Sequence, residues 1–282
     1  MPFRFAADFR PRVLALERQL ASRTGSAGAR RRGAQGDPWG HRPFVEGDDP
    51  RRIDWNVLAR LDELHVRQPG SGEAPELLLL LDRSGSMADE RGGKDGLQRE
   101  LAVALGWLGL AAGGTVQLAL AGEGGSVTLG RWQGARRFEP LLQVVENLPA
   151  PDGPTALSAL ATLRTAPHRI VILLSDGLVE PLPAAAVAAL ARAGGASLIL
   201  IAAACERMLP AGANRCLGGE GERECAVDDG AARQGAWTAA LAAHEEAWRR
   251  LCHVHGVRMT AADDSRPFED TLLRWCGPGG DA

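Results

Sequence analysis

The chain has 282 residues, of which 45% are hydrophobic and 24% charged, and its formal net charge is −3. These values are typical of globular proteins and exclude a largely disordered chain. The small net charge gives no general attraction to nucleic acids or acidic membranes. Five irregularly spaced cysteines do not indicate a disulfide scaffold. Charges interrupt the apolar residues among the first 20 positions, unlike a signal peptide, so we expect a cytoplasmic protein.

Residues 1–72 are predicted to form an N-terminal segment. It begins with an amphipathic helix from Arg10 to Ser22, in which apolar residues recur at helical spacing. Residues 24–40 are rich in Gly, Arg and Ala, and Arg30 to Arg32 are consecutive. This composition indicates a solvated loop, with a phosphate-binding patch as the alternative. A strand is predicted at Leu64 to Gln68, before a turn rich in Gly and Pro.

Residues 73–282 are predicted to form an α/β domain. Its first strand, Leu77 to Asp82, carries five successive leucines and has no polar face, as in a parallel strand covered by helices on both sides. Further apolar strands alternate with helices, which predicts an open, doubly wound, mostly parallel sheet with helices on both faces. A long surface loop is expected at about 209–235. The elements predicted after the leucine strand are helix Gly96 to Ala112, strand Val116 to Ala121, helices Ala135 to Asn147 and Ala156 to Arg164, strand Ile170 to Ser175, helix Ala184 to Arg192, strand Ser197 to Ala202, helix Ala236 to His253, strand Val257 to Thr260 and helix Pro267 to Trp275.

The uncharged stretch from Leu101 to Ala121 is about as long as a membrane span. The pair Gly113 and Gly114 punctuates it, and Gln117 interrupts the apolar run near its end. We therefore interpret it as a buried helix followed by a buried strand, and expect no membrane span.

Side chains with oxygen atoms follow the predicted buried strands. Asp82, Ser84 and Ser86 come after the leucine strand, Asp176 comes after a second buried strand, and Thr155 precedes a helix. In an open α/β sheet, ligands collect at the carboxyl ends of the strands. Two carboxylates and three hydroxyls are hard ligands that suit Mg²⁺ or Mn²⁺. So few charged ligands leave a position open for an Asp or Glu carboxylate of a partner protein.

These five residues resemble the metal-ion-dependent adhesion site of von Willebrand factor A domains. That site combines an Asp-x-Ser-x-Ser motif with a Thr and a second Asp, matched here by Asp82, Ser84, Ser86, Thr155 and Asp176. The resemblance implies a von Willebrand A-like fold and a metal-dependent module that binds protein and is not an enzyme. The alternative is that these residues only cap helices and form turns.

The run from Glu46 to Asn56, with the sequence EGDDPRRIDWN, resembles the signature of the bacterial DUF58 family. In that family a similar segment precedes a von Willebrand A-like domain. Proteins of this kind are associated with MoxR-type AAA+ ATPases, so the resemblance implies an adaptor or co-chaperone for such an ATPase. The segment either locks the N-terminal part onto the sheet or docks the ATPase. The residues assigned to docking are Asp48, Asp49, Arg51, Arg52, Asp54 and Trp55.

A metal-dependent hydrolase is the competing hypothesis, with Ser84 or Ser86 as a nucleophile beside Asp82. The sequence has no Gly-x-Ser-x-Gly elbow and places no His as an obvious base for either serine. It also has no Walker-type phosphate loop, so we do not expect the chain to hydrolyse ATP.

Two further kinds of binding have weaker support from the sequence. Zinc binding through Cys252, His253 and His255, with Cys225, lacks the paired Cys-x-x-Cys spacing of zinc sites. Nucleic-acid binding rests on Arg30 to Arg32 and scattered arginines, without nearby aromatic residues for base stacking. We expect neither.

Overall fold

The computed structural model divides the chain into two compact units, residues 18–74 and residues 1–17 with 75–282. In the smaller unit, β1 (Gly40–Pro43) pairs antiparallel with β2 (His65–Gln68). β2 is the strand predicted there, whereas β1 was not predicted. The structure describes residues 3–23, 40–43, 65–68, 76–88, 93–122, 125–153, 157–166, 168–209, 214–217, 224–227 and 230–277.

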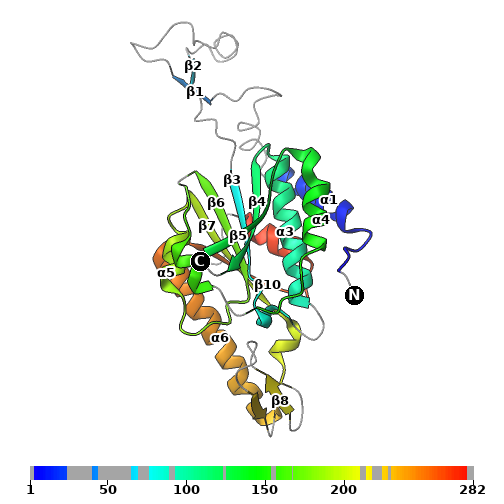
Figure 1. Ribbon diagram of the computed structural model, residues 1–282, viewed down its shortest axis with the longest axis vertical. Helices are drawn as coiled ribbons and strands as arrows, with labels where there is room; N and C mark the ends of the chain where they lie inside the picture. The colour runs from blue at the N-terminus through cyan, green and yellow to red at the C-terminus, as the bar shows by residue number, and fades with distance from the viewer. Residues whose placement is uncertain are drawn as a thin grey trace. The chain divides into compact units, whose positions relative to one another are not determined.

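A six-stranded sheet forms the centre of the larger unit, in the order β10-β7-β6-β3-β4-β5 (Figure 1). All neighbouring strands are parallel except β4 and β5. Read from β5, the six strands follow the 3-2-1-4-5-6 chain order of doubly wound folds. The predicted open, mostly parallel α/β sheet is therefore confirmed. The strands are β3 (Glu76–Leu81), β4 (Thr115–Gly122), β5 (Gly125–Gln133), β6 (Arg169–Ser175), β7 (Gly195–Ala202) and β10 (Arg258–Asp263).

The leucines of β3 explain why helices cover the sheet on both faces. β3 lies between β4 and β6, and all of its residues are buried. Because side chains alternate along a strand, Leu78 and Leu80 face one layer while Leu77, Leu79 and Leu81 face the other. Neither face can be left in water without exposing leucine side chains.

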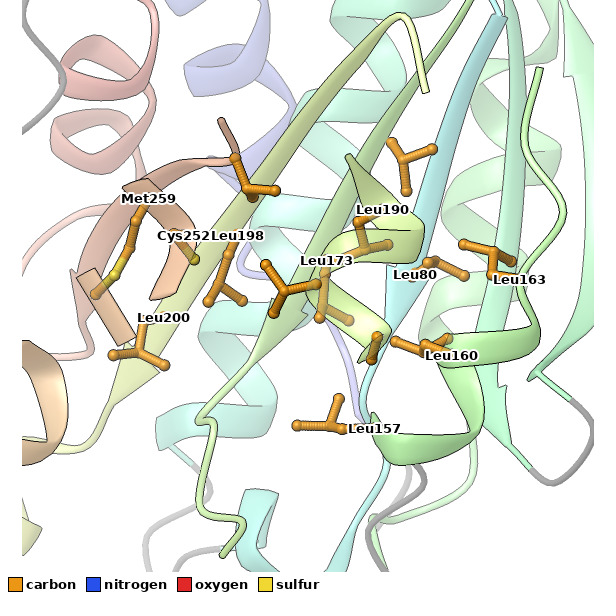
Figure 2. Packing of buried hydrophobic residues seen from close by; sticks show 14 of the residues in the cluster. Leu80, Leu157, Leu160, Leu163, Leu173, Leu190, Leu198, Leu200, Cys252 and Met259 are labelled. Atoms are coloured by element: carbon orange, nitrogen blue, oxygen red, sulfur yellow. The ribbon is translucent and has the colours of Figure 1, made fainter. Parts of the chain in front are cut away.

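One face of the sheet packs against the 3₁₀ helix η4 (Leu157–Thr162) and the helices α5 (Ala184–Leu190) and α6 (Gly230–His255). Figure 2 shows this layer, in which Leu80 and Leu173 of the sheet meet Leu160 and Leu190. The opposite face carries α3 (Gly93–Ala111), α4 (Phe138–Glu146) and α7 (Phe268–Trp275) (Figure 1). The expected helices on both faces are thus present.

Helix α1 (Phe9–Arg23) begins in the larger unit and confirms the predicted N-terminal helix. The Phe9 ring is fully buried, with its centroid 5.2 Å from that of Phe268 in α7. Arg12 donates two hydrogen bonds of 2.6 and 2.7 Å to Glu269. The start of α1 therefore packs with residues 75–282, although the sequence assigned it to the N-terminal segment.

Several predicted elements and boundaries were wrong. Strand β5 was missed because it is a half-exposed edge strand without a continuous apolar run. The expected loop at 209–235 contains two paired four-residue strands, β8 (Asn214–Leu217) and β9 (Glu224–Val227), which are too short to show a period. Helix α6 starts at Gly230 and not at Ala236. The helix predicted from Ala156 is the shorter η4.

The stretch from Leu101 to Ala121 comprises most of α3 and of β4, as the helix-then-strand interpretation predicts. Within the described ranges, no helix combines the length and the apolar character that a membrane crossing requires.

Candidate metal site

The candidate site lies at the carboxyl ends of β3 and β6, which are neighbours in the sheet. Leu81 and Leu174 are paired in register, so Asp82 and Asp176 leave the sheet at the same edge. This pair of strands is also the point at which the 3-2-1-4-5-6 order reverses, where ligands of open α/β sheets bind. The fold therefore brings together two of the predicted carboxylates.

Three predicted ligands form a hydrogen-bonded chain. The Ser84 Oγ and Ser86 Oγ atoms are 3.0 Å apart, and the Ser86 hydroxyl donates to Asp176 Oδ1 over 3.2 Å. Adjacent oxygens of an octahedral Mg²⁺ shell with bonds of about 2.0–2.1 Å are about 2.8–3.0 Å apart, close to the separation of the two serine oxygens. All three side chains are buried, and two hydroxyls with one carboxylate are hard ligands of the kind that suits a small divalent cation.

Asp82 lies beside this chain of oxygens and is 1% exposed. Its Oδ2 accepts a 2.6 Å hydrogen bond from the Ser175 hydroxyl, and its Oδ1 accepts one of 3.0 Å from the Ser84 backbone N–H. Burial raises the pKa of the Asp82 carboxyl, the bond from Ser175 opposes this rise, and the neighbouring Asp176 adds to it. A divalent cation at this edge would stabilise both carboxylates.

The predicted ligand Thr155 lies outside the described residues, and its role stays a prediction. The segment before it is described as far as Gly153, which forms a parallel bridge with Ser84. The Gly85 N–H donates to Gly153 O over 2.7 Å, and the Gly153 N–H donates to Arg83 O over 3.3 Å. The chain that leads to Thr155 is thus attached to the loop that carries the serines.

Lys94 is a charged residue of the site that the sequence analysis did not assign. Its side chain is fully buried, and Nζ donates to Asp176 Oδ2 over 2.9 Å and to Glu206. Burial disfavours the ammonium form, but the carboxylates of Asp176 and Glu206 outweigh it and raise the pKa of Lys94. A signal was present, because Lys94 is the single lysine of the chain.

Gln98 is a second residue that was missed. From α3, its buried Nε2 donates to the backbone oxygens of Asp82, over 2.8 Å, and Leu174, over 2.9 Å. Its Oε1 accepts a 3.1 Å bond from Arg83. Gln98 therefore joins the ends of β3 and β6 and holds the Asp82 loop. Its position among the apolar residues of α3 was the available signal.

Other predicted residues cannot be placed at this edge. The docking residues Asp48, Asp49, Arg51, Arg52, Asp54 and Trp55 lie outside the described residues, as does the Arg30 to Arg32 cluster.

The described part of the chain has no group of three or more His, Cys, Asp or Glu side chains that could hold a metal ion. For the zinc alternative, Cys252 is 1% exposed in the core and burial raises its pKa to about 12.

The family described as "Protein of unknown function DUF58" matches residues 40–247. The chain belongs to this family. A search of curated proteins finds no match. Among solved structures, the chain is similar to the crystal structure of conserved hypothetical protein BatB from Bacteroides thetaiotaomicron, at 15% sequence identity and a TM-score of 0.37. That similarity covers 70% of this chain and 94% of the other.

Proposed function

We propose that this DUF58 protein is a non-enzymatic, von Willebrand A-like module that binds another protein through a divalent metal ion. The observation that supports this function is the chain of oxygens from Ser84 through Ser86 to Asp176 at the carboxyl edge of the sheet. Hydroxyl and carboxylate oxygens are hard ligands that suit Mg²⁺ or Mn²⁺, and few of the ligands are charged.

In this proposal the ion is held by Asp82, Ser84, Ser86, Thr155 and Asp176. When bound, Mg²⁺ supplies a hard positive charge with an open position that suits an Asp or Glu carboxylate of the partner. The proposed partner is a MoxR-type AAA+ ATPase or its client, which makes the protein an adaptor or co-chaperone. This choice of partner rests on the resemblance to DUF58 proteins of that kind.

The hydrolase hypothesis lacks a histidine base in the described part of the site. The hydroxyls of Ser84 and Ser86 are bonded to each other and to Asp176, and no imidazole of the described residues bonds to them. Asp176 is the carboxylate that accepts from Ser86, and it is already paired with the ammonium of Lys94. The nearby amine of Lys94 has a raised pKa, so it stays protonated and cannot accept a proton from serine. We therefore propose that the protein is not an enzyme.

The test is the affinity for a purified MoxR-type ATPase from the same genome, measured by biolayer interferometry in Mg²⁺ and in EDTA. We expect Mg²⁺ to strengthen binding by the unchanged protein at least about tenfold, or about 1.4 kcal/mol. Asp82→Asn should remove this effect while circular dichroism shows a folded protein. Glu139→Gln, at a half-exposed carboxylate in α4, is the control and should behave like the unchanged protein.

Binding of the same strength in Mg²⁺ and EDTA would contradict the metal-dependent module. Hydrolysis of an ester or phosphate substrate that disappears in both Ser84→Ala and Ser86→Ala would favour the hydrolase instead.

A further inference from the structure

Lys94 places a positive charge where the proposed metal ion needs its ligands. The ammonium group is fully buried and bonds to Asp176 Oδ2 at 2.9 Å, while Asp176 Oδ1 accepts from Ser86. Taking an ammonium ion out of water costs several kcal/mol unless opposite charges surround it. Asp176 and Glu206 supply those charges, so a cation of the chain itself lies against Asp176.

The backbone around Lys94 holds this ion pair in position. An added Cβ at Gly93 would lie 1.9 Å from Asp264 Oδ2, so a larger residue at the start of α3 would have to displace this carboxylate. On the other side, Glu206 Oε2 accepts a 3.2 Å bond from the Ala203 N–H, and Glu206 O accepts one of 2.6 Å from Trp237. The position of the ammonium is therefore built into the fold.

A cation bound at Asp176 Oδ1 would share one carboxylate with the ammonium at Oδ2. Like charges at such a short separation repel strongly in a buried site. The ammonium already has a second partner in Glu206, which lines, with Asp176, a cavity of about 250 Å³ between the sheet edge and α6. Displaced from Asp176, the ammonium can stay paired with Glu206.

We propose that Lys94 is an internal counter-ion that competes with the divalent metal for Asp176, so that metal binding requires displacement of the ammonium from this carboxylate. This inference rests on the proposed function, because it assumes that the Asp82 edge is a metal site. It makes Lys94 the residue that sets the metal affinity of the site.

The test is the Mg²⁺ affinity measured by isothermal titration calorimetry. Lys94→Met keeps the length of the side chain and removes its charge, and we expect Mg²⁺ to bind at least about tenfold more tightly. Part of that gain would come simply from a more negative site. The double variant Lys94→Met with Glu206→Gln separates the two causes.

The double variant has the same formal charge at the site as the unchanged protein, if every carboxyl is counted as ionised. The charge is −2 in the unchanged protein, from Asp82, Asp176, Glu206 and Lys94, and −2 in the double variant, from Asp82 and Asp176. Competition by Lys94 predicts that the double variant still binds Mg²⁺ at least about tenfold more tightly than the unchanged protein. An unchanged or weaker affinity would overturn the inference. Because its charges are balanced, this comparison does not depend on the folding of the single variant.

Arg12→Met is the matched control for loss of a partly buried ion pair away from the site. Arg12 bonds to Glu269 through two hydrogen bonds, so its removal should lower stability and leave the Mg²⁺ affinity unchanged. A tenfold rise in this control would show that loosening the fold is enough and would contradict a specific effect of Lys94.

Different outcomes contradict the role of Lys94 and the proposed function. A tighter double variant together with metal-independent binding of the ATPase supports the role of Lys94 and contradicts the proposed function. If the double variant and the unchanged protein bind Mg²⁺ equally well and the ATPase binds only with metal, the proposed function is supported and the role of Lys94 is contradicted.

Discussion

Buried polar side chains connect the site to the segment that leads toward Thr155. Arg83 and Arg99 both donate to the carboxylate of Asp95 in α3 and to the backbone oxygen of Pro149. Burial lowers the pKa of Arg83, while the bond to Asp95 opposes this change. These bonds fix the chain after α4, so the position of the loop at Gly153 depends on individual guanidinium groups.

Gln98 allows a direct test of such a bond at the scale of one residue. Gln98→Leu keeps the volume but removes both hydrogen bonds to the ends of β3 and β6. Because buried carbonyls without a donor are costly, we expect the free energy of unfolding to fall by roughly 2–4 kcal/mol. Urea denaturation measures this change.

The same substitution at Gln143, which is exposed in α4, is the control and should change stability by less than about 0.5 kcal/mol. Equal effects at the two positions would mean that the bonds of Gln98 do not stabilise the site.

At the scale of elements, the turn after β6 fixes Asp176 against α6. Gly177 has a φ of +65°, and its carbonyl accepts a 3.0 Å bond from the buried Trp248 indole. A Cβ at Gly177 would lie 2.6 Å from Trp248 Nε1 and 2.7 Å from Leu200 Cδ1. The turn therefore requires glycine for both its conformation and its space.

Gly177→Ala should lower the free energy of unfolding by about 2–5 kcal/mol, from a strained backbone and an overpacked contact. Gly256→Ala is the matched control, because Gly256 has a φ of +68° and nothing within 4 Å of its added Cβ. It should cost only about 1–2 kcal/mol for the backbone. Equal losses of stability, measured by thermal denaturation, would exclude the contact with Trp248 as a cause.

The central strands could be predicted from the sequence because their environment is uniform. The leucines of β3 and the apolar run of β6 are buried on both faces, which a continuous apolar run reveals. β5 could not be found in this way, since its pairing with β4 at the sheet edge depends on backbone hydrogen bonds and shifts in register between Leu118 and Ala119 of β4.

The candidate site was predictable only in its local part. Asp82, Ser84 and Ser86 form one short motif, and Asp176 follows a recognisable strand, so strand ends alone bring them together. Lys94 and Glu206 come from the start of α3 and from η5 (Ala204–Arg207), 112 positions apart. Their meeting depends on tertiary packing, which no spacing in the sequence shows.

At the scale of the whole molecule, α1 joins the beginning of the chain to its end. Phe9 packs on Phe268 of α7, and Glu17 accepts a 3.1 Å bond from the Trp107 indole of α3. The helical layer of α3, α4 and α7 is therefore completed by α1. Loss of the contacts of α1 should weaken the whole unit and not only its N-terminus.

Phe9→Ala tests this dependence. Removal of a fully buried ring should cost about 3–5 kcal/mol and lower the Tm of the larger unit by about 6–15 °C. Val127→Ala removes an apolar side chain that is 54% exposed in β5, and this control should cost less than about 1 kcal/mol. Calorimetry distinguishes the possible outcomes. If α1 is integral, one transition shifts as a whole, whereas an unchanged main transition would mean that the sheet is stable without α1.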